Sequence, residues 1–126
     1  MIEKYFNTRL LTAATLATVT VLVLTHIPQS MMPSSLGGDW IDKIEHVVAY
    51  AIIVYLFLIS LRAAPSVRSI LLFCFAVSLI GALDELTQPF VNRTASVADM
   101  AADVVGILLA MVFFAVRSRR LIRPNA

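Results

Sequence analysis

The chain has 126 residues, of which 60% are hydrophobic and 14% charged, with a formal net charge of +2. This composition favours a membrane protein over a soluble domain, and the length allows a single domain. The basic residues lie at the ends of apolar runs and are not interleaved with aromatic residues on one surface, so no nucleic-acid partner is predicted.

The first apolar run, residues 10–27, is uncharged and follows Lys4 and Arg9. About 18 to 20 apolar residues are enough to cross a bilayer, so a transmembrane helix is predicted here. A cleaved signal peptide is the alternative, but no A-x-A-like cleavage site follows the run. His26, at the end of the run, is interpreted as an interfacial histidine.

Three further apolar runs follow a Pro-, Gly- and Ser-containing stretch, residues 28–41, which is predicted to be a loop. They predict transmembrane helices at residues 42–61, 67–88 and 97–116, and Pro89 ends the helix at 67–88. Cys74, the single cysteine, lies within an apolar run and is interpreted as a packing residue. The predicted fold is all-α: one membrane-embedded domain, residues 1–126, containing a bundle of four transmembrane helices.

The basic residues predict the orientation of this bundle. Eight of the ten lie in the N-terminal tail, the connection between the second and third helices, and the C-terminal tail. The positive-inside rule places these three segments, and therefore both termini, in the cytoplasm. The expected location is a bacterial cytoplasmic (inner) membrane, crossed several times, with Lys43 and Arg93 on the far side.

Polar residues recur at helical spacing at the predicted far side of the membrane. Residues three or four positions apart share a helix face, so Asp42, His46 and Tyr50 form one stripe and Asp99 and Asp103 another. Lys43 lies next to the outer end of the first stripe. Asp84, Glu85 and Gln88 lie at the outer end of the third helix, and Arg93 lies in the loop that follows it.

Helix capping is an alternative explanation for some of these residues. Asp39 with Asp42, and Ser96 with Asp99, have the spacing of N-cap pairs. His46 and Asp103 lie about 10 Å beyond these caps at 1.5 Å per residue, too deep for capping. Ionisable groups at such depth almost always face partners or a wet cavity, so a clustered site on three helices is predicted.

At these residues the sequence resembles the VanZ-like family of small bacterial membrane proteins. The resemblance spans about residues 39–110. Its first part is D-K-x-x-H-x-x-x-Y, present here as Asp42, Lys43, His46 and Tyr50. Its second part is E-x-x-Q, an arginine and D-x-x-x-N-x-x-G, matched by Glu85, Gln88, Arg93, Asp99 and Gly106. Asp103 stands where the family usually has asparagine. The resemblance implies a link to glycopeptide tolerance, because the family's namesake is associated with low-level teicoplanin resistance.

The first functional hypothesis is a cell-envelope protein that binds an anionic membrane lipid or lipid-linked precursor. Phosphate-binding roles are predicted for Lys43, Arg93, Gln88 and Tyr50. Asp42, Asp99 and Asp103 are predicted to orient the cations and the histidine. The sequence identifies neither a cofactor nor an oligomeric state.

The second hypothesis is a membrane-embedded lipid phosphate hydrolase or transferase with His46 and Glu85 as general acid and base. No compact ligand motif supports a metal, and none is predicted. Proton-coupled transport is a further possibility, but no broken helix or inverted repeat supports it. In the last alternative, the protein is a structural membrane subunit whose polar cluster only locks its helices together.

Overall fold

The computed structural model describes residues 2–31 and 39–122. Within these ranges the protein is all-helical, as predicted, with four long helices: α1 (Thr8–Thr25), α2 (Asp39–Ser60), α3 (Val67–Thr87) and α4 (Val97–Ile122). Three short 3-10 helices accompany them: η1 (Ile2–Lys4), η2 (Gln29–Met31) and η3 (Gln88–Val91). Each long helix is long and apolar enough to cross a membrane.

The helix bounds differ slightly from those predicted, for local reasons. α1 begins and ends two residues earlier than predicted, and Pro28 keeps the residue before it out of the helical region. α4 continues to Ile122, beyond the predicted end at residue 116. The additional residues are rich in arginine. Arginine ends the apolar run, but its high helix propensity lets the helix continue.

Short polar signals fix the ends of α3. Ser66 caps its start by accepting a hydrogen bond from the Ser69 N–H at 3.1 Å. At the other end the chain passes directly into η3, where Pro89 is one of the first residues. Asn92 then adopts a left-handed conformation with φ 59°, which turns the chain towards α4.

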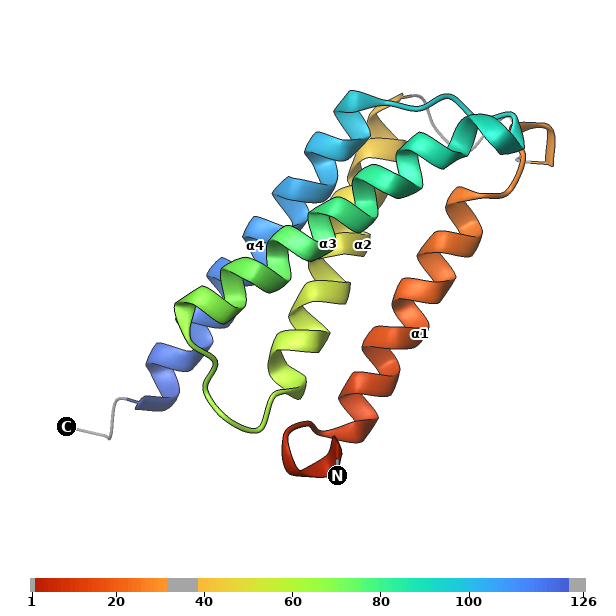
Figure 1. Ribbon diagram of the computed structural model, residues 1–126. Helices are drawn as coiled ribbons and strands as arrows, with labels where there is room; N and C mark the ends of the chain where they lie inside the picture. Colours follow the sequence, from red (N-terminus) through yellow and green to blue (C-terminus); the bar gives the residue numbers. More distant parts are fainter. Residues whose placement is uncertain (1, 32–38, 123–126) are drawn as a thin grey trace.

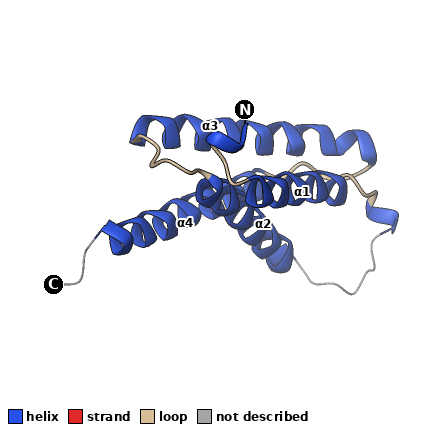
Figure 2. Cartoon of the chain, turned by 90° about the horizontal axis from the view of Figure 1, so that it is seen from below, coloured by secondary structure: helices blue, strands red, loops and turns tan. Residues whose placement is uncertain are grey.

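Successive helices run in opposite directions, so α1 starts and α4 ends at the same end of the bundle (Figure 1). α2 packs against both α1 and α4, while α3 packs against α4. Figure 2 shows α3 lying across one side of the group formed by the other three helices.

Backbone hydrogen bonds fasten the N-terminal segment to the end of α2. The Asn7 N–H donates to the Ser60 carbonyl at 2.7 Å, and the Arg62 N–H donates to the Tyr5 carbonyl at 2.9 Å. Phe6 and Leu61 form an isolated antiparallel bridge. The first residues of the chain and the connection between α2 and α3 therefore lie together.

Burial follows the pattern of a membrane protein. Large apolar side chains are exposed on the outer faces of the helices, among them Leu72, Phe75, Leu108 and Phe113. The interior combines an apolar core around Val54, Leu58 and Ile107 with several buried polar groups. Because lipid tails solvate apolar surface well, the outer faces need no protein cover, and the polar groups point inward.

Gly106 allows α2 and α4 to approach closely. A Cβ at this position would overlap the Val47 carbonyl oxygen and lie 3.0 Å from the Ala51 backbone nitrogen. Small residues at such contacts let transmembrane helices pack backbone to backbone. This close contact sets the distance between the polar stripes of α2 and α4.

Candidate functional site

Polar side chains from α2, α3, α4 and the segment after η3 meet at the end of the bundle where α2 and α4 begin. We call this group the polar cluster; it consists of Asp42, Lys43, His46, Glu85, Gln88, Arg93, Asp99 and Asp103. The structure thus brings together eight of the nine predicted site residues. The ninth, Tyr50, lies one turn further along α2 and is also buried.

His46 and Asp103 form a buried pair between α2 and α4. His46 Nδ1 lies 2.7 Å from Asp103 Oδ1, and the two residues are 7% and 2% exposed. With Asp103 ionised, its carboxylate only accepts hydrogen bonds, so Nδ1–H is the donor and the ring orientation is fixed. His46 Nε2 is the other ring nitrogen, 3.8 Å from Glu85 Oε1.

Glu85 joins the end of α3 to the start of α4. Its side chain is fully buried; Oε1 accepts from Gln88 Nε2 at 2.7 Å and Oε2 accepts from the Ser96 N–H at 2.9 Å. Through these two hydrogen bonds the carboxylate has a structural role: it connects the end of α3 to the segment before α4. Its catalytic role stays a prediction.

Both cations of the cluster lie near carboxylates. Lys43 Nζ is 3.3 Å from Asp99 Oδ1, and an Arg93 guanidinium nitrogen is 3.9 Å from Asp42 Oδ1. Arg93 also contacts the Ile27 carbonyl at 3.5 Å, so it reaches from the segment before α4 to the end of α1.

The capping alternatives have different outcomes. Ser96 Oγ accepts from the Asp99 N–H at 3.2 Å, so Ser96 caps α4. α2 begins at Asp39, but the Asp39 side chain lies outside the described part of the structure. The Asp99 carboxylate itself is directed elsewhere: its Oδ1 is buried and makes no hydrogen bond to any described residue.

Gly81 makes room for the inner end of the site. A Cβ added there would lie 2.8 Å from Asp103 Oδ2 and 2.9 Å from the Tyr50 hydroxyl oxygen. Those two polar atoms therefore occupy the space that a side chain on α3 would fill. Tyr50 closes the cluster towards the apolar core.

A second polar group, which the sequence did not predict, links α1 to α3. Thr25 Oγ1 donates to Asp84 Oδ1 at 3.0 Å, and His26 Nδ1 lies 3.3 Å from the same oxygen. His26 Nε2 contacts Thr87 Oγ1 at 3.0 Å. The sequence does contain a signal for this contact: Thr25 and His26 end the first apolar run, and the four-helix topology places them at the same membrane depth as Asp84.

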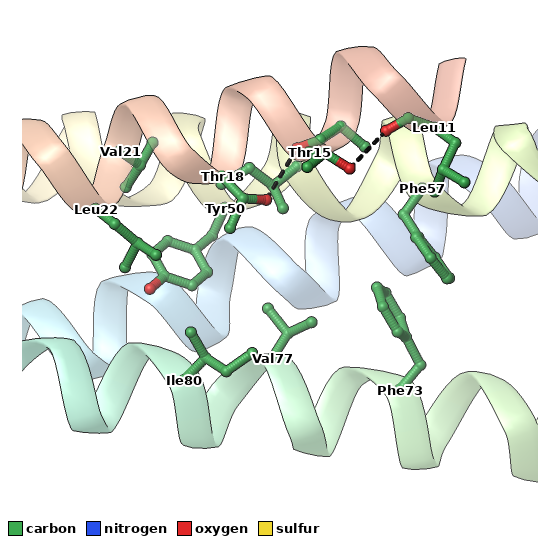
Figure 3. A pocket seen from close by; sticks show the side chains of 12 residues that line it. Leu11, Thr15, Thr18, Val21, Leu22, Tyr50, Phe57, Phe73, Val77 and Ile80 are labelled. Carbon is green, nitrogen blue, oxygen red and sulfur yellow. Dashed lines mark hydrogen bonds between the residues drawn. The ribbon is translucent and has the colours of Figure 1, made fainter. Parts of the chain in front are cut away.

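Two cavities adjoin at this site. One of about 100 Å³ is lined by the polar residues Asp42, Glu45, His46 and Arg93 together with residues of α1. The other, of about 200 Å³, lies between α1, α2 and α3 and has an almost wholly apolar lining that includes Leu22, Phe57 and Val77 (Figure 3). Val21 lines both cavities, so the cavity that carries the charged side chains lies next to the apolar one.

The chain matches the VanZ/LLP1 family over residues 3–118. It belongs to the VanZ/LLP1 family. The match includes all four helices except the last residues of α4, and it confirms the family resemblance predicted from the sequence. No curated protein and no solved structure matches the chain. This VanZ/LLP1 protein is thus a multi-pass membrane protein that carries a buried polar cluster at one end of its helices.

Proposed function

We propose that this protein binds an anionic membrane lipid or a lipid-linked precursor of the cell envelope. The polar cluster would hold the phosphate, and the apolar cavity would hold part of the hydrocarbon chain. The supporting observation is a pair of cavities that share Val21: charged and titratable side chains line part of one, and the other is lined almost wholly by apolar residues. A lipid has the same division between head group and chain.

Arg93 is the main candidate for phosphate binding. It lines the polar cavity, and its distance of 3.9 Å to Asp42 is too long for a hydrogen bond. Its guanidinium group therefore keeps donors for a ligand, and its planar geometry matches two phosphate oxygens. Lys43, whose side chain is 31% exposed, adds a second positive charge near the cavity.

The apolar cavity suits a hydrocarbon chain because the hydroxyls of its two threonines already have hydrogen-bond partners. The hydroxyls of Thr15 and Thr18 donate to the backbone carbonyls of Leu11 and Ala14 at 3.0 and 2.9 Å. These bonds turn both hydroxyls towards α1 itself (Figure 3). The remaining lining is mainly aliphatic and aromatic, a surface without strong binding sites for water.

The proposed location is the bacterial inner membrane, with the polar cluster on the extracytoplasmic side. Arg62 lies in the connection between α2 and α3, and Arg68 lies in the first turn of α3. Both are at the opposite end of the bundle from Lys43 and Arg93, an arrangement that follows the positive-inside rule. A protein that holds envelope precursors on that side would affect glycopeptide tolerance, as the teicoplanin link of the family's namesake suggests.

The test is mass spectrometry of lipids that co-purify with the protein from bacterial membranes. We expect an anionic lipid with the wild type and a clear loss of it with Arg93→Ala, because the phosphate loses its bidentate partner. Arg68→Ala, an exposed arginine at the other end of the bundle, is the matched control and should retain the lipid. Identical lipids in the wild type and Arg93→Ala would refute the proposal.

One observation favours the enzymatic alternative, a lipid phosphate hydrolase or transferase. The hydrogen bond between His46 and Asp103 orients the imidazole as a general base requires, and His46 lines the polar cavity. The same lipid assay, run over time in liposomes, distinguishes the two functions. A product formed by the wild type and absent with His46→Gln would make the protein an enzyme, and retention without turnover supports binding.

A further inference from the structure

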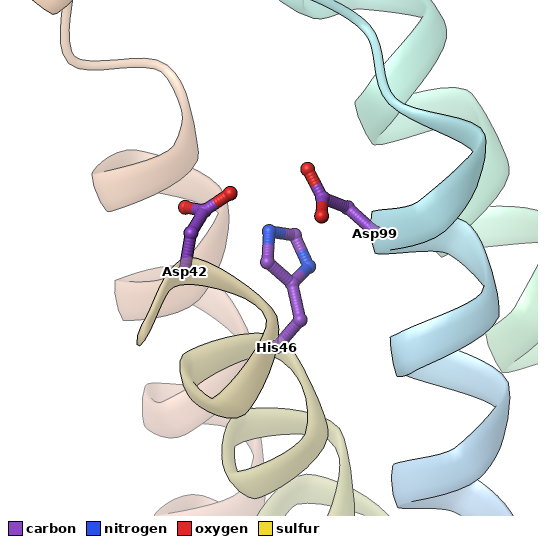
Figure 4. Close-up of side chains that lie close together, drawn as sticks. All are labelled: Asp42, His46 and Asp99. Carbon is purple, nitrogen blue, oxygen red and sulfur yellow. The ribbon is translucent and has the colours of Figure 1, made fainter. Parts of the chain in front are cut away.

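Three side chains of the polar cluster have the arrangement of a metal-binding site. Asp42, His46 and Asp99 each offer one ligand atom, and these atoms all lie within 4.8 Å of one another. Figure 4 shows the imidazole of His46 between the two carboxyl groups. We propose that these three residues bind a divalent cation of the zinc type. This inference goes beyond lipid binding and does not depend on it.

The charges of the cluster favour a bound cation. Among the residues that the structure describes, four carboxylates, those of Asp42, Glu85, Asp99 and Asp103, share the cluster with two permanent cations, Lys43 and Arg93. Three of the four carboxylates are nearly inaccessible to solvent. Buried carboxylates need pairing to remain ionised, and a divalent cation supplies the two positive charges that the protein lacks here.

Asp99 supplies independent evidence for a ligand. It is 5% exposed, yet its Oδ1 makes no hydrogen bond within the described part of the chain. The ammonium group of Lys43 lies 3.3 Å from this oxygen and forms an ion pair with it, without hydrogen-bond geometry. Buried polar atoms are normally hydrogen-bonded, so an oxygen held by an ion pair without such a bond retains the capacity to coordinate a cation.

Asp103 prepares His46 for this role. The hydrogen bond at 2.7 Å uses Nδ1 and fixes the tautomer, which leaves Nε2 with a lone pair. Metal-bound histidines almost always donate their second nitrogen to such a carboxylate or carbonyl. Asp103 is therefore a positioning residue and not a ligand.

The ligand types point to zinc and not to magnesium or calcium. One imidazole and two carboxylates suit Zn²⁺, whereas Mg²⁺ and Ca²⁺ prefer oxygen ligands alone. In a tetrahedral site with bonds of about 2.0–2.1 Å the ligand atoms lie ~3.4 Å apart, so the three groups must move inward. Asp42 can do so, because its side chain is 41% exposed. Asp42 and His46 also line the polar cavity, which leaves a position for water or for a phosphate oxygen.

The experiment is a Zn²⁺ titration of the full-length chain, purified in detergent and first treated with a chelator. We expect one zinc ion per chain in the wild type. Asp42→Asn should weaken binding by more than about tenfold, since even the loss of an outer-shell partner costs about 10–100-fold. Glu45→Gln is the matched control: it changes a carboxylate of the same cavity and helix that is not one of the three ligands.

Two further measurements complete the test. Zinc-edge X-ray absorption should show nitrogen and oxygen ligands at about 2.0–2.1 Å and no sulfur. Lys43→Met should tighten zinc binding, because it removes the cation nearest to Asp99 Oδ1. Absence of saturable zinc binding, or equal affinities of the wild type and Asp42→Asn, would overturn the proposal. Lipid retention is measured separately, so failure of the metal site leaves the lipid-binding result unchanged.

Discussion

At the scale of single residues, Asp103 sets the orientation of the His46 ring. Its carboxylate holds Nδ1 of His46, and its other oxygen faces the space beside Gly81 and Tyr50. The family usually has asparagine at this position, whose side-chain oxygen can also accept the bond. Aspartate keeps that geometry and adds a negative charge.

This comparison gives a prediction for stability. Asp103→Asn should change the free energy of unfolding little, whereas Asp103→Ala should lower it by about 1–3 kcal/mol because a buried donor on His46 loses its partner. The measurement is thermal or denaturant unfolding in detergent. Equal destabilisation by both substitutions would show that the charge of Asp103, and not the hydrogen bond, supports the fold.

Residue spacing predicted which side chains would meet, but not how they would pair. The i, i+4 stripes on α2 and α4 placed His46, Asp99 and Asp103 at similar depth. Whether Asp99 or Asp103 would contact His46 depends on how the two helices are rotated, which spacing does not specify. The hydrogen bond from the Ser96 N–H to Glu85 likewise requires the turn through η3 and the left-handed Asn92, whose combined geometry residue spacing does not specify.

At the scale of helices, the apolar runs were sufficient to predict all four. Their length and lack of charge identify them, since spans of this kind satisfy every backbone group internally. The helix ends were harder to predict, as the extension of α4 to Ile122 shows. The contact of α1 with α3 through Thr25 and Asp84 was missed, because a threonine and a histidine at a helix end have an ordinary interfacial explanation.

The contact between α2 and α4 depends on Gly106. Gly106→Ala should destabilise the protein by about 1–3 kcal/mol, since the added methyl group meets the backbone of α2 and not a flexible side chain. Separation of these helices should also weaken zinc binding, because the proposed ligands lie on both. Ala115→Val, on the exposed face of α4, is the control for added volume. A fully stable Gly106→Ala protein would contradict the close backbone contact.

At the scale of the whole molecule, polar groups lie inside one end of a bundle whose outer faces are apolar. This distribution follows from four alternating crossings, which bring the start of α2, the end of α3 and the start of α4 to one level. The sequence therefore predicted the end of the bundle at which the site would lie. It did not predict the two adjoining cavities, since their shape depends on side-chain packing between α1, α2 and α3.

The predicted orientation can be tested with single cysteines in a Cys74→Ala background. A cysteine at Asn92, exposed in the segment between η3 and α4, should react with a membrane-impermeant thiol reagent in intact cells. A cysteine at Ala64, exposed in the connection between α2 and α3, should react only after the cells are permeabilised. The reverse pattern would place the polar cluster in the cytoplasm.

The attachment of α1 at both ends has a consequence for how the proposed lipid would enter the apolar cavity. At one end the Asn7 N–H is bound to Ser60, and at the other Thr25 is bound to Asp84. Between these fastenings, α1 and α3 face each other across the apolar cavity. α1 is thus attached to the rest of the bundle near both of its ends. If the proposed lipid binds, its hydrocarbon chain would enter between α1 and α3 from the side of the bilayer, while these two attachments hold the ends of α1 in place.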